Sequence, residues 1–442
     1  MKVATLSIVT TTTIAALTSA EKSISTVASH LEKRFLEEKD TLEAELIKWK
    51  NSNSGLAARA NGFYKVQEGV GLQSTDDDQL RRFFNTKVEI EKTSKLNPHA
   101  NFTVNSPFTL MTNDEFAKYA TGAFRQGGDI AGNKVTSKVH GRQLRGVQSN
   151  WNDWNNWNDW SDPSDPSWPT EDPWNPNQPT EDPWNPNQPT QDPVWPTSQP
   201  DPTDSPVGPT WKPDPTNQPN PSNGPTTQPG SGKDWSTGTC ISPVRNQGSC
   251  GSCWAFATVG AVESAYCLKT GSLTQFSEQY LTSCETQQSR GCSGGFPDGA
   301  IEYVAQHGIC KASDYPYTSG NSGNTGQCND SCEKVQVGVK GAVSVNGGDS
   351  GLASAIDRQP VVVVVAAGNS VWKQYSGGVV SSCDTSNVDH AVLAVGYSEN
   401  YFKIRNSWGS QWGENGYILL QRGGSQRSGT CEILSAPSYP SL

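Results

Sequence analysis

The sequence predicts an α+β fold in two lobes for the C-terminal half of the chain. An apolar run with helical spacing follows Cys253 and ends near Lys269 and Gly271, a basic last turn and a glycine stop. A second helical stretch is expected around 277–284. Helices first and antiparallel strands later indicate two lobes, a helical one and a β-barrel-like one. The strands are expected at 361–365, 391–397, 401–404 and 416–420.

The amino-acid composition bears on how much of the chain packs and on its possible partners. Among 442 residues there are 29 prolines, and the mean hydropathy is −0.62, so much of the chain does not pack into a core. The net charge of −10 and the lack of a basic run argue against nucleic acid as a partner.

The first twenty residues are typical of a secretory signal peptide. Lys2 precedes an apolar, threonine-rich centre, and Thr18-Ser19-Ala20 suits cleavage near Ala20. The apolar stretch is too short to span a bilayer, so no membrane association is expected. We therefore expect a secreted, extracellular protein, with a lysosomal or vacuolar destination as the alternative. The ten cysteines other than Cys253 form an even set, which suits an oxidising compartment.

Two further regions precede the C-terminal half. Residues 21–126 are charged and mainly helical by pattern, with amphipathic spacing at 31–38 and 43–47. Residues 127–232 hold nine tryptophans and 21 of the prolines, and a ten-residue unit occurs at 171–180 and again at 181–190. Such proline spacing bars helix and sheet and predicts a disordered linker. The alternative is a ribbon whose tryptophans bind cell-wall polysaccharide or a protein partner.

Cys253 has the position of a nucleophile. It lies at the N-terminus of the expected buried helix, where the helix dipole is expected to lower the pKa of a thiol. A disulfide, a redox Cys250-x-x-Cys253 pair or half of a zinc site are the other readings. Zinc needs two more ligands with matching spacing, and the sequence downstream holds no paired C-x-x-C or H-x-x-x-H. No metal and no cofactor are therefore expected.

Three dispersed motifs carry a family resemblance. The stretch Cys250-Gly251-Ser252-Cys253-Trp254 is a local signature of papain-type proteases, which have a histidine and an asparagine about 130 to 150 residues later. His390 follows Cys253 by 137 residues and Asn406 by 153, both in apolar blocks that predict strands. The chain resembles the papain-like cysteine proteases, in particular their cathepsin L-like branch, over 234–442 and more weakly over 80–122.

The resemblance implies a thiol peptidase. Cys253 would attack the peptide carbonyl, and His390 as imidazolium would stabilise the thiolate and protonate the leaving amine. Asn406 would orient the imidazole through its other ring nitrogen, and Trp408 would shield that bond. Gln247 would donate to the oxyanion. The implied partners are protein or peptide substrates, and a monomer is expected.

The resemblance also implies substrate contacts. Gly294 and Gly295 would pair with an extended substrate as an added strand does. Asp389 would line the cleft without belonging to the catalytic triad. An apolar pocket predicts Leu or Phe over Arg at the second residue before the scissile bond (P2). That pocket would be formed by Phe296, Pro297, Val364, Val388, Ala391 and Ala436.

By the same resemblance, residues 21–126 are an inhibitory propeptide, and residues 233–442 are the protease domain, released by cleavage near 225–233. The helical motif around Arg82, Phe84 and Ile90 is one residue short, and Leu110 replaces an expected aspartate in the block 108–116. A pH-triggered release that needs that aspartate is therefore unsupported.

Three disulfides are implied by the resemblance. They are Cys250–Cys292, Cys284 with Cys328 or Cys332, and Cys383–Cys431. The four remaining cysteines (Cys240, Cys267, Cys310 and one of the 328/332 pair) allow three connectivities, among which the sequence does not choose. A catalytically idle binding protein and a transferase that passes the acyl group to an amine are the alternative functions.

Overall fold

The computed structural model describes residues 7–64, 76–121 and 232–442, with side chains from residue 29 onward. The chain divides into two units, and of the first (Met1–Thr26 and Gln143–Thr226) only the helical residues 7–26 are described. Everything below concerns the second unit, Val27–Arg142 with Thr227–Leu442. The tryptophan repeats, the linker through residue 231 and most of the expected cleavage region lie outside the described residues.

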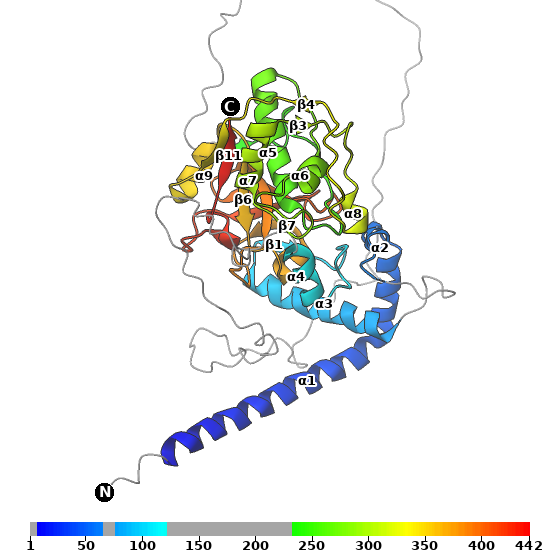
Figure 1. Cartoon of the computed structure of the whole chain (residues 1–442). Helices are drawn as coiled ribbons and strands as arrows, with labels where there is room; N and C mark the ends of the chain where they lie inside the picture. The colour runs from blue at the N-terminus through cyan, green and yellow to red at the C-terminus, as the bar shows by residue number, and fades with distance from the viewer. Residues whose placement is uncertain (1–6, 65–75, 122–231) are drawn as a thin grey trace, which may run out of the picture. The chain divides into compact units, whose positions relative to one another are not determined.

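The N-terminal helical region (residues 29–121 as described) has a core of its own. It contains α1 (Ser7–Lys50), α2 (Asn53–Ala60), α3 (Asp77–Leu96), β1 (Ala100–Phe102) and α4 (Asn113–Thr121) (Figure 1). The amphipathic helices expected at 31–38 and 43–47 are confirmed as parts of α1. Phe35 and Trp49 of α1 are buried in one cluster with Phe83 of α3, because the apolar faces of both helices meet there. None of the helices in the described ranges is long and apolar enough to cross a membrane.

The helical lobe is built on α5 (Cys253–Thr270), which carries the predicted apolar run. The helix ends at Gly271, whose φ of 78° satisfies the left-handed cap that the sequence predicts. Trp254 and Val259 of α5 pack against Tyr280 of α6 and Ile301 of α7. The remaining elements of this lobe are α6 (Glu278–Cys284), α7 (Pro297–His307), α8 (Ser319–Ser322) and the pair β3 (Ile309–Cys310) and β4 (Lys334–Val335).

The second lobe is a nine-stranded sheet in the order β1-β7-β10-β9-β8-β6-β11-β5, with β2 paired to β8. Its strands beyond β1 are β2 (Lys233–Asp234), β5 (Gly341–Ser344), β6 (Val361–Val365), β7 (Tyr375–Val380), β8 (His390–Tyr397), β9 (Tyr401–Arg405), β10 (Tyr417–Gln421) and β11 (Ser438–Ser441). The predicted strands are confirmed, but the sheet is not wholly antiparallel, because β10 pairs with β7 in parallel. Helices α9 (Gly348–Ile356) and α10 (Ser370–Gln374) and the short η1 (Thr430–Glu432) complete the lobe.

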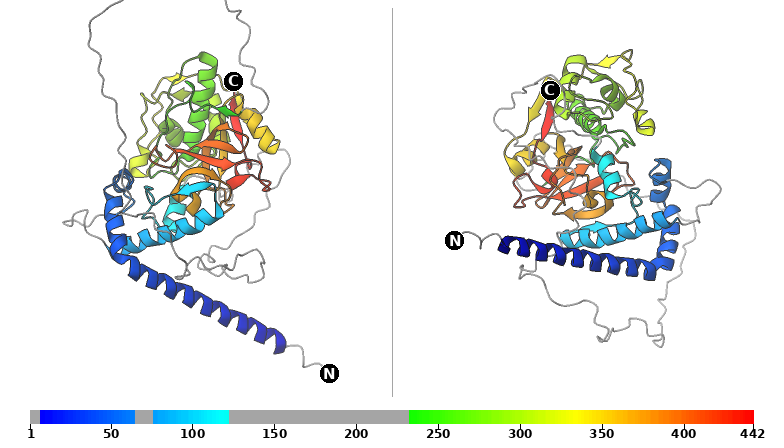
Figure 2. Two further views of the ribbon diagram at one scale, coloured as in Figure 1. Left: turned by 180° about the vertical axis from the view of Figure 1, so that it is seen from behind. Right: turned by 60° about the horizontal axis from the view of Figure 1, so that its bottom comes forward.

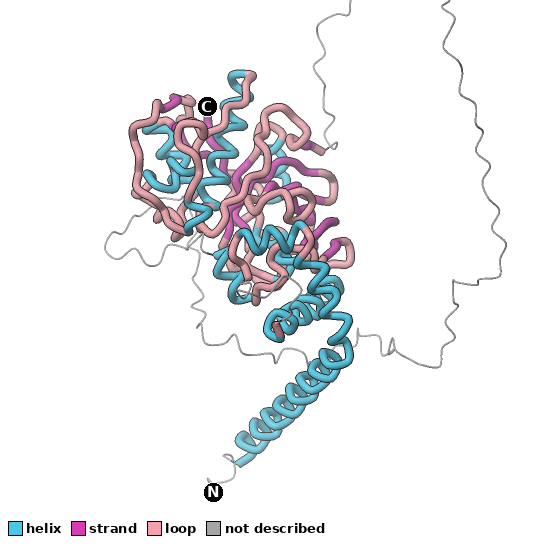
Figure 3. Tube along the Cα trace, turned by 90° about the vertical axis from the view of Figure 1, so that its right-hand side faces the viewer, coloured by secondary structure: helices cyan, strands magenta, loops and turns pink. Residues whose placement is uncertain are grey.

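The lobes meet along α5 and β8. Figure 3 shows the helices of the first lobe beside the strands of the second, and the left view of Figure 2 shows the two lobes from behind relative to Figure 1. Cys253, Ala257 and Ala261 of α5 share one buried cluster with Ala391 and Leu393 of β8. The small side chains of α5 let a helix approach the sheet closely, and this packing fixes the start of α5 against the start of β8.

The N-terminal helical region joins the sheet as an edge strand. Ala100 of β1 pairs antiparallel with Gly378 of β7, so this region extends the sheet lobe through main-chain hydrogen bonds. Asn97 supports the joint, because its side-chain oxygen accepts from the backbone amides of Ser381 and Ser382, each at 2.9 Å.

The two lobes contain five disulfide bonds. The pairs Cys250–Cys292 and Cys383–Cys431 are confirmed, and Cys284 pairs with Cys328. The structure also chooses among the open connectivities: Cys240 pairs with Cys267 and Cys310 with Cys332. Cys253 is the cysteine outside these bonds.

Candidate active site

Cys253 is the first residue of α5 and is fully buried. Its Sγ lies 3.1 Å from the backbone nitrogen of Ala391, which donates to it. Ala391 follows His390 in β8, so the helix start and the strand start meet at the thiol. The structure therefore brings together two residues, Cys253 and Ala391, that are 138 residues apart in sequence.

His390 is held from two sides. Its Nε2 lies 2.8 Å from the side-chain oxygen of Asn406. The indole of Trp408 stacks on the imidazole, with the ring centroids 4.7 Å apart and the planes at 27°. Among the described residues, none forms a hydrogen bond with Nδ1 of His390. The ring is thus oriented through Nε2, as the sequence predicts for an asparagine partner.

Asn406 lies one residue beyond β9, not within a strand as its apolar block predicts. Its side-chain oxygen also accepts from the backbone nitrogen of Ser407 at 2.8 Å. This local bond fixes the amide so that its oxygen faces His390.

The charge state of the pair differs from the expectation. Burial raises the pKa of the Cys253 thiol, although the Ala391 amide acts in the opposite direction. Burial likewise lowers the pKa of His390 to about 4, despite its bond to Asn406. The expectation of a lowered thiol pKa is wrong for this form of the chain, because full desolvation outweighs a helix dipole worth about 0.3–1 kcal/mol.

Gln247 is fully buried and its amide is oriented by neighbours. Ser407 donates through Oγ to the side-chain oxygen of Gln247 at 2.6 Å, and the Gln247 amide nitrogen donates to the carbonyl of Cys250 at 3.1 Å. Ser407 thereby connects Gln247 with Asn406. The sequence gives no signal for this serine beyond its place next to Asn406.

Asp389, directly before His390, is bound to backbone amides and not to the imidazole. Its carboxylate accepts from the backbone amides of Ala367 at 2.7 Å and Gly368 at 2.9 Å, in the loop after β6. Burial raises the pKa of this carboxyl to about 7, and the two amides oppose the shift. The side chain therefore anchors the loop after β6.

The residues expected to contact substrate lie in several parts of the two lobes. Val364, Val388 and Ala391 pack in one apolar cluster with Cys253. Phe296 caps α7 and Pro297 is its first residue, while Gly295 is so close to Trp254 that a Cβ there would lie 2.6 Å from the indole. Gly294 has a φ of 105°, a backbone conformation that favours glycine. Ala436 is exposed, in the segment before β11 that Ser438 ties to Asp298 of α7.

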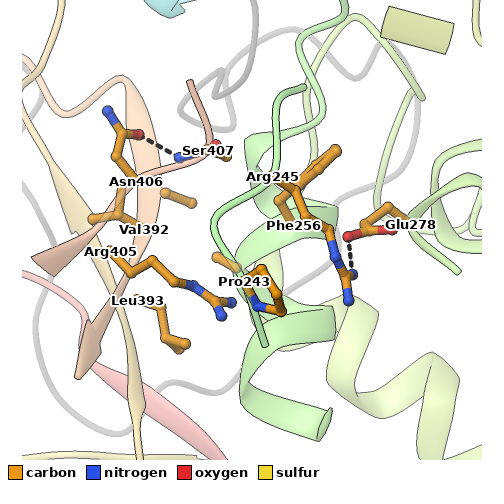
Figure 4. Close-up of a pocket in the computed structure, with 11 residues that line it drawn as sticks. Pro243, Arg245, Phe256, Glu278, Val392, Leu393, Arg405, Asn406 and Ser407 are labelled. Atoms are coloured by element: carbon orange, nitrogen blue, oxygen red, sulfur yellow. Dashed lines mark hydrogen bonds and ion pairs between the residues drawn. The ribbon is translucent and has the colours of Figure 1, made fainter. Parts of the chain in front are cut away.

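A small cavity of about 20 Å³, large enough for about one water molecule, lies between residues of α5 and α6 and residues of β8 and β9. Arg405 reaches into it from the sheet side, while Arg245 and Glu278 pair on the helical side (Figure 4). Arg245 also binds Glu263 of α5 at 2.7 Å. The lining comprises Pro243, Arg245, Phe256, Ala257, Glu278, Ala391, Val392, Leu393, Arg405, Asn406 and Ser407.

This ionic group is part of the site's support and was not predicted from the sequence. Arg405 Nη1 donates to the carbonyl of Ser242 at 2.7 Å, and Ser242 Oγ donates to the buried carboxylate of Glu263 at 2.5 Å. The sequence signal was available, since Glu263 is an acid within the apolar run of α5, and a buried charge needs a partner. Within the described ranges, no cluster of His, Cys, Asp and Glu side chains is arranged for a metal ion.

The comparisons identify the family. The model of the papain family of cysteine proteases matches residues 230–441. Papain of Carica papaya is 41% identical over 214 residues, which are 47% of this chain and 59% of papain's sequence. The crystallised Carica candamarcensis cysteine protease CMS1MS2, in complex with E-64, is 41% identical over 48% of this chain and 98% of that chain, with a TM-score of 0.45. The chain belongs to the papain family of cysteine proteases, and it spans less than two thirds of papain's sequence.

The fold also matches a proform. The ragweed pollen allergen Amb a 11, a cysteine protease crystallised in its proform, is 25% identical, with 92% of this chain and 88% of that chain covered and a TM-score of 0.58. The match includes the N-terminal helical region as well as both lobes. The predicted two-lobed, papain-like α+β fold is confirmed.

Proposed function

We propose that this chain is the zymogen of a cysteine endopeptidase that hydrolyses peptide bonds through Cys253, His390 and Asn406. The observation that carries the proposal is the junction of α5 and β8. There the buried thiol accepts from the residue after His390, and His390 in turn is bound to Asn406 at 2.8 Å. The papain-family match over residues 230–441 supports the same reaction.

The proposed chemistry proceeds in two halves. The thiolate of Cys253 attacks the peptide carbonyl carbon, and the carbonyl electron pair moves to its oxygen. His390 then gives its proton to the leaving amine as the C–N bond breaks, leaving a thioester. Water attacks the thioester, its proton passes to His390, and the C–S bond breaks to release the acid. Asn406 keeps the imidazole oriented in both halves.

Gln247 is proposed to stabilise the oxyanion. Its amide nitrogen carries two hydrogens, and one of them donates to the Cys250 carbonyl at 3.1 Å. The bond from Ser407 to the Gln247 oxygen keeps this nitrogen on the side of Cys250, close to the start of α5. Losing a donor of this kind costs about 10² to 10³ in rate.

The N-terminal helical region is proposed to be the propeptide that inhibits the enzyme. Phe108, Phe116 and Tyr119 lie edge-on or tilted to the indole of Trp408, with ring centroids 5.4, 5.5 and 5.9 Å away. Trp408 is the residue that stacks on His390. In this form the thiol and the imidazole are both buried and uncharged, a state that suits storage and not attack.

Polar contacts strengthen the propeptide's hold. Lys373 of α10 is 1% exposed and pairs with Glu89 of α3 at 3.0 Å, and it also donates to the side chain of Asn113 at 3.0 Å. Ser106 donates to the Lys373 carbonyl at 2.8 Å. Together with the β1–β7 pairing, these bonds support an inhibitory domain that ends before residue 127, with the linker through 232 between it and the protease domain.

Secretion is part of the proposal. Five disulfides support maturation in an oxidising compartment, whether the final destination is extracellular or vacuolar. The signal peptide through Ala20 remains a prediction.

Titration with E-64, an epoxide that traps active-site thiols, tests the function. The processed chain should consume one equivalent and lose peptidase activity in proportion, while the intact chain should react far more slowly. Cys253→Ala should consume none and cleave nothing. A Cys253→Ala protein that still hydrolyses peptides would overturn the scheme, and a processed wild type that forms only amides with added amine would indicate acyl transfer instead.

A further inference from the structure

A tyrosine outside the expected site connects the two ends of the segment 247–252, which leads into Cys253 and is called the nucleophile loop below. The hydroxyl of Tyr317 donates to the backbone carbonyl of Gln247 at 2.8 Å. The same hydroxyl lies 2.7 Å from Oγ of Ser252, the residue directly before Cys253. One oxygen atom therefore links the proposed oxyanion donor to the N-terminus of α5.

The ring of Tyr317 also packs against the start of α5. It meets the ring of Phe256, in the first turn of α5, edge-on with centroids 4.9 Å apart. Its two polar contacts and this ring contact all fall within ten residues of chain, from Gln247 to Phe256. Tyr317 thus contacts the loop and the helix that the loop leads into.

The segment that carries Tyr317 is itself anchored. The side-chain oxygen of Gln279, in α6, accepts from the backbone amides of Thr318 at 2.8 Å and Ser319 at 3.0 Å. The carbonyl of Gly320 accepts from the amide of Ser249 at 2.8 Å. Helix α6 thereby holds the segment 317–320 against the nucleophile loop.

The contacts have a consequence for catalysis. An oxyanion donor acts only when its N–H points to the place where charge develops, and its orientation must be set before the reaction. The side chain of Gln247 is set by Ser407, but its backbone is set by Tyr317 and by the bond from its own amide to the Ser407 carbonyl at 2.8 Å. Removing the tyrosine hydroxyl removes one of the two hydrogen bonds that hold the Gln247 backbone, and leaves only its amide bond to Ser407.

We propose that Tyr317 is a positioning residue of the peptidase: its hydroxyl fixes the Gln247 backbone relative to Ser252 and so aligns the oxyanion donor with the sulfur of Cys253. This inference rests on the proposed function. In this role Tyr317 acts through Gln247 and takes no part in bond making or breaking.

The test is Tyr317→Phe in the full chain, processed as the wild type is. Phenylalanine keeps the ring contact with Phe256 and loses both hydroxyl contacts. We expect kcat to fall about tenfold with KM within about twofold, because the lost alignment matters only in the transition state. Gln247→Ala should lower kcat by about 10² to 10³. In a chain that already carries Gln247→Ala, adding Tyr317→Phe should lower kcat further by less than about twofold, because the effect of Tyr317 passes through Gln247.

Tyr315→Phe is the matched control. It lies two residues away, and its hydroxyl donates to the Gln327 carbonyl at 2.8 Å, away from the nucleophile loop. It should leave kcat unchanged. The melting temperature of each variant separates folding from catalysis.

Two outcomes would overturn the inference. One is a Tyr317→Phe enzyme with a lower melting temperature and an unchanged kcat, which means that the hydroxyl only stabilises the fold. The other is the same tenfold loss with and without Gln247, which means that Tyr317 acts elsewhere. Failure of the proposed function gives a different result, since the processed wild type would then not consume E-64.

Discussion

Trp408 lies between the N-terminal helical region and His390. Its indole stacks on His390 at 4.7 Å, and its outer contacts include Phe116, an α4 residue that is fully buried. Aromatic contacts of this kind stabilise by about 0.5–1.5 kcal/mol beyond the area they bury. The ring that stacks on His390 is therefore also part of the surface that contacts the N-terminal helical region.

Replacing Asn406 tests the orientation of the base. Asn406→Ala removes the acceptor 2.8 Å from Nε2 of His390. A hydrogen bond to a charged group is worth about 1.5–3 kcal/mol, so kcat should fall about 10- to 100-fold in the processed enzyme. Asn400→Ala, in the exposed turn between β8 and β9, is the control and should leave kcat unchanged. An Asn406→Ala enzyme with wild-type kcat would remove this residue from the site.

The ion pair between Glu89 and Lys373 should contribute to holding the proposed propeptide on the two lobes. Glu89→Gln leaves Lys373 without its counter-charge, and that lysine is 1% exposed. Because Glu89 itself is 25% exposed, we expect a loss of about 1–3 kcal/mol, less than for a fully buried pair, and correspondingly faster activation of the full chain. The activation time course at fixed pH measures this.

Glu91→Gln is the control for the ion-pair experiment. Glu91 lies on the same helix and pairs with Arg34, within the propeptide, so its bond does not cross to the enzyme. Its activation rate should match the wild type. Equal acceleration by both variants would mean that weakening the propeptide itself, and not the contact with Lys373, controls release.

Acidification should lower the contribution of His390 to the folding stability of the full-length chain. Its pKa of about 4 lies below its ordinary value of 6.5, so the folded state favours the neutral ring. As pH falls from about 6.5 to 4, this shift lowers the free energy of unfolding by about 3 kcal/mol. Asp389 acts in the opposite sense, because its raised pKa of about 7 costs stability as pH rises from its ordinary value through 7.

The unfolding free energy of the full-length Cys253→Ser protein, measured from pH 6.5 to 4, checks this dependence. Because the His390 and Asp389 contributions oppose each other over this pH range, a further His390→Gln change should make the protein gain stability on acidification, and Asp389→Asn should expose the His390 loss. Titration of His390 near 6.5 in the intact chain, followed by NMR, is the result that contradicts the prediction.

If the apolar residues that the family resemblance assigns to the P2 pocket form it, they should select the substrate's P2 side chain. Val364, Val388 and Ala391 offer no acceptor to a guanidinium, and burying one without a partner is costly. The processed enzyme should therefore cleave Phe-Arg reporters at least about tenfold better than Arg-Arg reporters in kcat/KM. Ala436→Glu should raise cleavage of Arg-Arg. A tenfold preference of the wild type for Arg-Arg would refute the pocket assignment.

The bond between Cys240 and Cys267 should stabilise the helical lobe. It closes a sequence separation of 27 residues between the segment before the nucleophile loop and the end of α5. Replacing both cysteines with serine should lower the free energy of unfolding by about 2–4 kcal/mol, measured in denaturant. Peptide mapping that links Cys240 to Cys310 would contradict the pairing.

The sequence by itself determined the elements and the reacting groups. The apolar run after Cys253 and the glycine at 271 specified α5 locally, through periodicity and capping. A local motif surrounds each of Cys253, His390 and Asn406. These motifs and the spacing between them indicated the peptidase site, because each motif can be read from neighbouring residues alone.

Only the tertiary structure decided what depends on distant neighbours. The pKa of Cys253 is raised because burial removes water, an effect that no local pattern contains. The pairing of Cys310 with Cys332, the parallel contact of β10 with β7 and the ion pair of Glu89 with Lys373 all join segments whose approach is set by packing. Desolvation and close packing act between residues far apart in the chain, so they are fixed only when the chain has folded.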